Sequence, residues 1–268
     1  MIIDPEKVAA LVAEIAEEEI MSRFGALAES DIDTKSGPQD YVTAADHAAE
    51  ARLEKALLGL YPGAVFIGEE GVAAEPDLVD HLDQEKGAFW IVDPLDGTRN
   101  FVQGRREFGT IVALVENGEV RQGWIYAVPD RGFAIASKGD GVTWRGEKAL
   151  PVLNGASAFK GYRAVSKLSE PWKSKLIRPL KESYETEPIR CSAYGYINLV
   201  RGRKSFGLYA RCSPWDHAAG ALMLTENSGR AAYMDDGAAY APRLTVGRPL
   251  LVTSREPDWT EISETLLA

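Results

Sequence analysis

A short stretch in the first half of the chain decides the fold. Residues 90–101 read Trp-Ile-Val-Asp-Pro-Leu-Asp-Gly-Thr-Arg-Asn-Phe. The apolar run before Asp93 predicts a buried strand, because β-branched and aromatic residues dominate it and Pro94 then ends it. Gly97 lets the chain bend sharply, so that its amide can approach a ligand. A strand that ends in Asp93, Asp96, an amide and a hydroxyl suits a hard cation with a phosphate bound to it. The alternative is an acidic turn that caps a helix.

The length and charge of the chain limit the classes of protein that it can represent. The 268 residues can bury a large core, and we expect one domain with halves at about 1–150 and 151–268. The net charge of −10 argues against broad binding of nucleic acid or anionic membranes. No run of eighteen apolar residues predicts a membrane span.

The N-terminal residues and the cysteines indicate a cytoplasmic protein. Residues 1–6 lack the basic segment followed by an apolar one that marks a secretory signal. Cys191 and Cys212 have no metal-type spacing, so we expect two reduced thiols.

The first half of the chain predicts two helices followed by several strands. The helices are expected over 4–25 and 43–60, and residues 73–87 are expected to form an irregular acidic linker. The expected strands, largely an antiparallel meander, are 64–67, 89–92, 110–115, 120–128, 132–136 and 142–144. This order indicates an α+β arrangement and not a βαβ alternation.

The second half of the chain is predicted to contain both strands and helices. Expected strands are 162–165, 189–191, 205–209, 231–234 and 250–252. Expected helices are 171–180, 193–201, 213–228 and a short one after Pro257.

Four acidic elements are scattered along the chain and need one explanation. Most of them sit at the end of a predicted strand or the start of a predicted helix, where binding groups are usually presented. They are Asp46, Glu69 with its neighbour Glu70, the Asp93/Asp96 pair, and Asp216. Capping of a helix that starts at Thr43 is the alternative for Asp46. Because His/Cys ligand sets are missing and oxygen ligands abound, the pattern favours Mg²⁺, with Mn²⁺ as a substitute. His217 is expected to be a packed or capping residue.

Four motifs carry a resemblance to a known family. They are residues 40–46 (Asp-Tyr-Val-Thr-Ala-Ala-Asp), 67–70 (Ile-Gly-Glu-Glu), 90–101, and 215–220 (Trp-Asp-His-Ala-Ala-Gly). In this order and spacing the chain resembles the inositol monophosphatase family, within the group that includes fructose-1,6-bisphosphatases and nucleotide 3′-phosphatases. The resemblance implies a layered α-β-α-β-α sandwich and hydrolysis of a phosphate monoester.

The resemblance also implies a role for particular residues. Up to three Mg²⁺ ions would be held by Glu69, Asp93, the Leu95 carbonyl, Asp96 and Asp216. Glu69 and Thr98 would orient and activate the attacking water, with Asp46 hydrogen-bonded to Thr98. The amides of Gly97 and Thr98 would hold the substrate phosphate, and Lys35 corresponds to a lysine near the active site. A homodimer and inhibition by Li⁺ are further implications.

The acidic motif has two alternative functional interpretations. Aspartyl-phosphate phosphatases carry a similar motif, but with a spacing of two and in chains that alternate strand and helix. Covalent attack would give retention at phosphorus, whereas direct attack by water gives inversion. A phosphate-binding or regulatory protein that has lost the chemistry is the second alternative, although none of the matching acids is missing. The sequence has no Walker loop.

The substrate is the least determined part of the function. Ala193, Tyr194 and Gly195 stand where inositol monophosphatases read the sugar hydroxyls with a Gly-Thr-Ala segment, and Tyr209 replaces an expected glutamate. Together with Asp216 these residues are the candidate substrate contacts. The Ala-Tyr-Gly segment is similar to that of histidinol-phosphate phosphatases. We expect a small polyol or sugar monophosphate as substrate.

Two adjacent arginines follow the central motif. Arg105 and Arg106 could contact a second phosphate, as in bisphosphate nucleotidases, or simply form a solvated basic turn.

Overall fold

The computed structural model describes residues 3–28, 31–34, 41–84, 86–151 and 159–268. The helices of the first half are α1 (Pro5–Ile15), α2 (Ala44–Leu60), α3 (Glu69–Ala74) and α4 (Thr98–Val102), with a π-helical turn at Ala16–Ile20 and 3₁₀ turns at Met21–Arg23, Pro76–Asp83 and Val128–Asp130. Its strands are β1 (Ile32–Thr34), β2 (Tyr41–Thr43), β3 (Val65–Gly68), β4 (Ala88–Asp96), β5 (Gly109–Glu116), β6 (Glu119–Ala127), β7 (Gly132–Ser137), β8 (Gly141–Trp144) and β9 (Glu147–Lys148).

The second half contributes fewer of the described strands than the first. Its elements are β10 (Lys160–Ala164), α5 (Trp172–Ser183), β11 (Glu185–Pro188), α6 (Ser192–Val200), β12 (Phe206–Cys212), α7 (Pro214–Glu226), β13 (Arg230–Tyr233), β14 (Thr245–Thr253) and α8 (Glu256–Leu267). None of the helices in the described part of the chain is long and apolar enough to cross a membrane.

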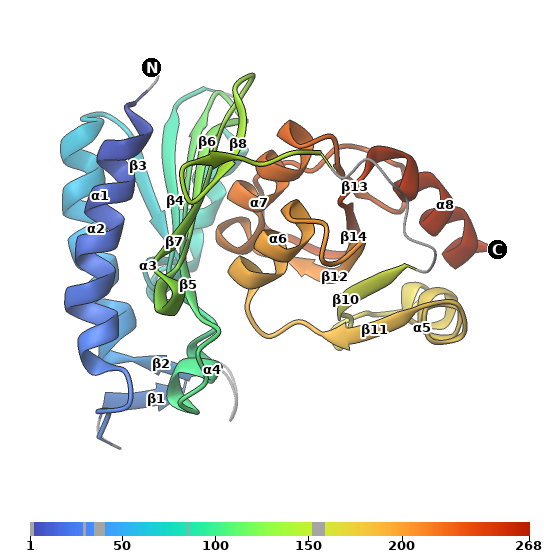
Figure 1. Ribbon diagram of the computed structural model, residues 1–268, viewed down its shortest axis with the longest axis horizontal. Helices are drawn as coiled ribbons and strands as arrows, with labels where there is room; N and C mark the ends of the chain where they lie inside the picture. Colours follow the sequence, from blue (N-terminus) through green and yellow to red (C-terminus); the bar gives the residue numbers. More distant parts are fainter. Residues whose placement is uncertain (1–2, 29–30, 35–40, 85, 152–158) are drawn as a thin grey trace.

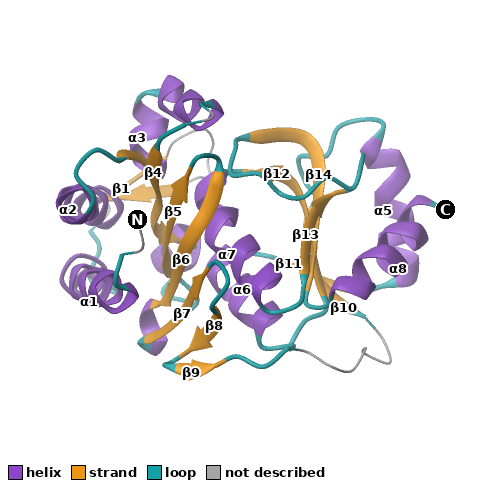
Figure 2. Cartoon of the chain, turned by 90° about the horizontal axis from the view of Figure 1, so that it is seen from above, coloured by secondary structure: helices purple, strands orange, loops and turns teal. Residues whose placement is uncertain are grey.

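The elements stack in five layers, which confirms the expected α+β fold and the α-β-α-β-α order. Figure 1 shows α1 and α2 on one side, followed by the sheet that contains β4, by α6 and α7, by the sheet that contains β12, and by α5 and α8. Figure 2 shows the same order of layers from above. The helices α6 and α7 therefore lie between two sheets and are covered on both faces.

The first sheet has the strand order β3-β4-β5-β6-β7-β8-β9. Strand β3 runs parallel to β4, and the remaining neighbours are antiparallel, as the meander predicted. Side chains alternate between the two faces of a strand, and all residues of β4 are buried, so both of its faces are covered. Trp90 and Val92 pack with α1 and α2, whereas Phe89 and Ile91 belong to the core cluster shared with α6 and α7. A strand covered on both faces explains the continuous apolar run that precedes Asp93.

The second sheet has the order β11-β10-β12-β14-β13, with β11, β10 and β12 parallel. Along β12, Leu208 packs with α5 and α8, and the next residue, Tyr209, joins the cluster around α6 and α7. The second sheet thereby covers the face of α6 and α7 that the first sheet does not contact.

Three predictions about individual elements were wrong. The strand expected to end before Pro94 continues to Asp96, because an irregularity between Asp93 and Asp96 accommodates a proline that cannot donate to the ladder. The segment 73–87, expected to be an irregular linker, contains the 3₁₀ turn Pro76–Asp83, in which the buried Val79 and Leu82 lie three residues apart, as 3₁₀ geometry requires. The strand expected at 189–191 lies earlier, at β11. Its exposed, polar sequence escaped prediction because β11 is an edge strand that pairs with β10 alone.

Candidate metal centre and adjoining pocket

An irregularity in β4 brings its two aspartates together. Asp93 pairs with Ile111 and Asp96 with Gly109, so β4 carries one extra residue between these two positions. In a regular strand, residues three apart would face opposite sides of the sheet. A bulge at this point redirects the strand, and both carboxylates contribute to one cluster.

Three carboxylates form this cluster. Oxygen atoms of Asp93, Asp96 and Asp216 lie within 4.8 Å of one another, and Asp216 is in the first turn of α7. Burial, then the charges of Asp96 and Glu69, raise the pKa of Asp216 well above its ordinary value. Burial also raises the pKa of Asp96. Within the described residues, neither Asp96 nor Asp216 forms an ion pair with Lys or Arg. Clustered carboxylate oxygens are donors that fit Mg²⁺.

The start of α6 holds Asp96 in place. Its Oδ2 atom accepts hydrogen bonds from the Ala193 N–H at 2.6 Å and from the Cys191 thiol at 2.8 Å. Burial and the neighbouring carboxylate raise the pKa of the Cys191 thiol well above its ordinary value, which keeps the thiol protonated as a donor. Cys191 and Cys212 are both free and buried. The sequence pattern predicted no role for Cys191; the available signal was its position just before the Ala-Tyr-Gly segment.

Thr98 lies between two acceptors. Its Oγ1 is 3.1 Å from Asp46 Oδ1 and 2.9 Å from the Leu95 carbonyl oxygen, and these acceptors compete for one proton. Asp46 also accepts from the backbone and hydroxyl of Thr43, forming the capping box that the sequence suggested. Asp46 therefore caps α2 and contacts Thr98, so the two roles considered for it are compatible.

The first turn of α3 carries Glu69, and a residue that sequence analysis missed supports this turn. The carboxylate of Glu50 on α2 accepts from the N–H groups of Glu70 at 2.9 Å and Gly71 at 2.6 Å. A side chain on Gly68 would collide with this carboxylate. Glu50 lies one turn after Asp46, and this i, i+4 spacing on the buried side of α2 was the available signal. Glu70 itself is buried, with its side chain outside the carboxylate cluster.

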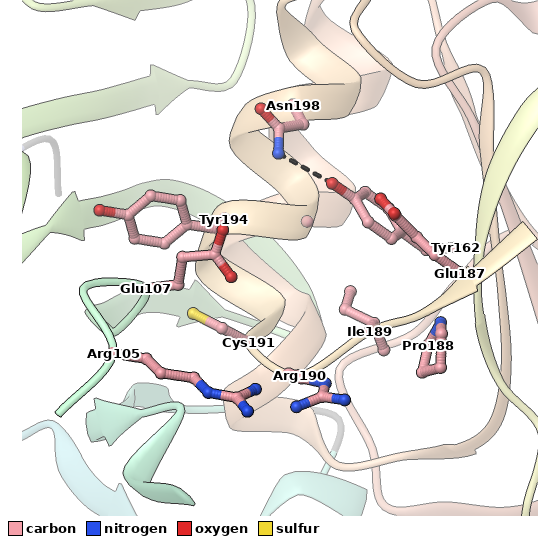
Figure 3. A pocket seen from close by; sticks show the side chains of 11 residues that line it. Arg105, Glu107, Tyr162, Glu187, Pro188, Ile189, Arg190, Cys191, Tyr194 and Asn198 are labelled. Atoms are coloured by element: carbon pink, nitrogen blue, oxygen red, sulfur yellow. Dashed lines mark hydrogen bonds between the residues drawn. The ribbon is translucent and has the colours of Figure 1, made fainter. Parts of the chain in front are cut away.

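A pocket of about 320 Å³ adjoins the cluster. Figure 3 shows its side chains: Arg105, Glu107, Tyr162, Glu187, Pro188, Ile189, Arg190, Cys191, Tyr194 and Asn198, and Gly195 also lines it. Cys191 connects the two features, because it lines the pocket and contacts Asp96. Tyr194 donates to Asp130 at 2.9 Å, which fixes one wall. Arg106 does not line the pocket; its guanidinium donates to the Pro129 carbonyl.

Tyr209, a candidate substrate contact, and His217, expected to be a packed residue, both lie in the core behind the pocket. Tyr209 packs against His217 with ring centroids 4.6 Å apart, and its hydroxyl finds no hydrogen-bond partner among the described residues. This hydroxyl would be 3.7 Å from a Cβ atom placed on Gly195, so it lies directly under the pocket lining. His217 contacts the Tyr196 hydroxyl at 2.8 Å, and burial lowers its pKa to about 4, as expected for a packed residue. Lys35 lies outside the described residues.

Fold and site together define a class of protein: a five-layered α+β chain with an oxygen-rich cation site at the end of a bulged strand. The chain belongs to the inositol monophosphatase family, whose model matches residues 4–266.

The relatives of this chain carry more than one name. It is 31% identical over 206 residues to an inositol-1-monophosphatase of Bacillus subtilis, which covers 74% of each chain. It is 30% identical to the Nus factor SuhB of Xylella fastidiosa, over 76% of this chain and 72% of that one. A crystal structure of a staphylococcal IMPase-I complexed with products matches with a TM-score of 0.79, covering 98% of this chain and 95% of that chain at 17% identity, which concerns the fold alone.

Proposed function

We propose that this protein is a Mg²⁺-dependent phosphatase that hydrolyses a small phosphate monoester to an alcohol and phosphate by direct attack of water. One observation carries the proposal: oxygen atoms of the buried Asp93 and Asp96 and of the half-buried Asp216 converge within 4.8 Å. The Thr98 hydroxyl, within hydrogen-bond distance of Asp46, follows the same bulged strand.

The proposed ligands of the cation are these three carboxylates, that of Glu69 and the Leu95 carbonyl oxygen, and Mn²⁺ would be a substitute. Mg²⁺ bound there would neutralise charge on the phosphate and lower the pKa of a coordinated water. Thr98 and Glu69 would orient the attacking water by accepting hydrogen bonds from it, and the Glu69 carboxylate would accept its proton. The N–H groups of Gly97 and Thr98, at the start of α4, have no acceptor within that helix and donate to the phosphate oxygens.

The leaving group would occupy the pocket beside Asp96. Its volume of about 320 Å³ suits a small polyol or sugar monophosphate, such as an inositol phosphate. Tyr194 and Gly195 line this pocket, and the neighbouring Ala193 holds Asp96. Tyr209 provides a buried phenol where inositol monophosphatases have a glutamate, and the Ala-Tyr-Gly segment is similar to that of histidinol-phosphate phosphatases, so histidinol phosphate is one alternative substrate. Arg105, which lines the pocket, would suit a 3′(2′),5′-bisphosphate nucleotide as the other.

Phosphate release from a panel of esters tests the reaction. The panel contains inositol 1-phosphate, histidinol phosphate, 3′-phosphoadenosine 5′-phosphate, fructose 1,6-bisphosphate and glycerol 2-phosphate, each assayed with Mg²⁺ and with EDTA. We expect Mg²⁺-dependent release that Asp93→Asn abolishes. Asp140→Asn is the matched control, because Asp140 is exposed on the turn between β7 and β8. Retention at a chiral phosphorus would contradict direct attack by water.

A non-catalytic regulatory role is the second candidate function, because some relatives are named Nus factors. Failure of the intact protein to release phosphate from every ester, with Mg²⁺ present, would favour it over the phosphatase.

A homodimer and inhibition by Li⁺ belong to the same proposal. Both follow from the family alone, and sedimentation and a Li⁺ titration at fixed Mg²⁺ test them.

A further inference from the structure

The hairpin formed by β8 and β9 turns at an arginine that its backbone conformation disfavours. Its two-residue loop is Arg145 and Gly146, with φ values of 53° and 79°. The loop of the β5–β6 hairpin, Asn117 and Gly118, has the same two φ values. Two-residue loops with positive φ at both positions favour Asn-Gly, because asparagine adopts positive φ more readily than residues with longer side chains. Arg145 therefore carries a conformational cost that the same turn avoids elsewhere in the chain.

The guanidinium group of Arg145 is held over the ring of the preceding residue, Trp144. Its carbon atom lies 5.3 Å from the ring centroid, and one of its nitrogen atoms donates to the Asp130 carbonyl at 2.9 Å. At the end of α6, the guanidinium carbon of Arg201 lies 5.2 Å from the same ring centroid. The hairpin and the helix thus bring two guanidinium groups to one tryptophan.

Arg203 adds a third positive charge, and we call Arg145, Arg201 and Arg203 the arginine cluster. Arg203 lies in the loop after α6, where its backbone N–H donates to the Asn198 carbonyl at 2.8 Å. Partial burial, then the positive charges of Arg203 and Arg145, lower the pKa of Arg201. All three residues of the cluster are exposed, so a ligand can reach them from solvent.

Within the residues that the structure describes, the arginine cluster forms no ion pair with a carboxylate. The charge of Asp130 acts on Arg201, but the Asp130 carboxylate accepts from the Tyr194 hydroxyl at 2.9 Å. Glu147, which lies opposite Trp144 in the hairpin, is exposed and is not paired with the cluster either. Because neighbouring guanidinium groups repel one another, an anion bound among them would be stabilised.

We propose that the arginine cluster, around Trp144, is a binding site for a phosphate or sulfate group. Three guanidinium groups can donate to the several oxygens of a tetrahedral oxyanion, whereas a carboxylate offers only two. Stacking on an aromatic ring orders a guanidinium group before the ligand arrives, which lowers the entropic cost of binding. The site is separate from the pocket beside Asp96, whose lining includes no residue of the cluster.

Nuclear magnetic resonance of the isotopically labelled protein, with EDTA present and at constant ionic strength, tests the site with inorganic phosphate. We expect saturable shifts of the Trp144 indole N–H and of the Nε–H groups of the arginine cluster. Sulfate should give similar shifts, and acetate should bind much more weakly. Absence of saturable shifts with phosphate, or equal affinity for acetate and phosphate, would overturn the proposal.

Variants of the cluster test the assignment to these side chains. Arg145→Asn suits the turn, because asparagine occupies the matching position of the β5–β6 loop, so a loss of binding is not a loss of the hairpin. We expect Arg145→Asn and Arg203→Gln each to weaken phosphate binding about tenfold. Arg178→Gln is the matched control, because Arg178 is exposed and is paired with Glu182 at 2.8 Å. Unchanged affinity in both cluster variants, or an equal loss in the control, would contradict the assignment.

The location of the site is tested separately from the proposed reaction. Arg203→Gln should release phosphate from the ester panel, with Mg²⁺ present, at the same kcat/KM as the unmodified protein, because Arg203 lies outside the catalytic pocket. A tenfold fall in kcat/KM for this variant would show that the cluster belongs to the catalytic site and would overturn the inference of a separate one.

Discussion

The position of Glu69 depends on a carboxylate on the neighbouring helix, and substitution of that carboxylate makes a measurable prediction. Glu50 is only 8% exposed and accepts two backbone hydrogen bonds from the first turn of α3. Glu50→Gln keeps the shape but replaces one acceptor oxygen by an NH₂ group that faces an N–H donor. Because a hydrogen bond to a charged group contributes about 1.5–3 kcal/mol, we expect the free energy of unfolding to fall by about 2 kcal/mol.

The same substitution should weaken cation binding if Glu69 is a ligand. Loss of a group that orients a metal ligand typically costs about 10–100-fold in metal affinity, so the Mg²⁺ concentration at half-maximal phosphate release should rise about tenfold. Urea unfolding measures the first effect and a Mg²⁺ titration measures the second. Glu54→Gln, exposed one turn further along α2, is the control. Identical unfolding free energies and Mg²⁺ titrations for the two variants would refute the role of Glu50.

Three further predictions concern the site itself. Thr98→Val should lower kcat about 100-fold, whereas Thr98→Ser, which keeps the hydroxyl, should retain most activity; equal losses would contradict a role for the hydroxyl. Gly97 has φ +86° and a Cβ there would lie 3.0 Å from the Glu107 carbonyl, so Gly97→Ala should cost about 1–3 kcal/mol in thermal unfolding, and an unchanged Tm would be inconsistent with this strain. Burial raises the pKa of Asp96 and Asp216 above the ordinary 3.8. In the cation-free protein, the contribution of these two carboxyl groups to the free energy of unfolding is therefore fully present below about pH 4, where both are protonated. It is lost as the pH rises through their raised pKa values. The increase in Tm on adding Mg²⁺ to protein in EDTA should therefore be larger at about pH 8 than at about pH 5, and a difference independent of pH would speak against ionisation at this cluster.

The regular elements were predictable where one physical signal dominated. The apolar run of β4 and the Thr43–Asp46 capping box of α2 are local patterns, and both appear in the structure where expected. The edge strand β11 was placed wrongly, because an exposed edge needs no apolar pattern.

The sequence by itself determined the family and predicted the type of chemistry, because the residues proposed to carry it are oxygen donors placed in local motifs. Asp93, Asp96 and Thr98 lie within one strand and the turn after it, and the roles proposed for them come from the resemblance of this motif to the family. Only the tertiary structure decided which residues from other parts of the chain surround this motif. Arg105 and Arg190 are far apart in the chain, and they line one pocket because α6 packs against the end of β4, a contact that no local pattern encodes.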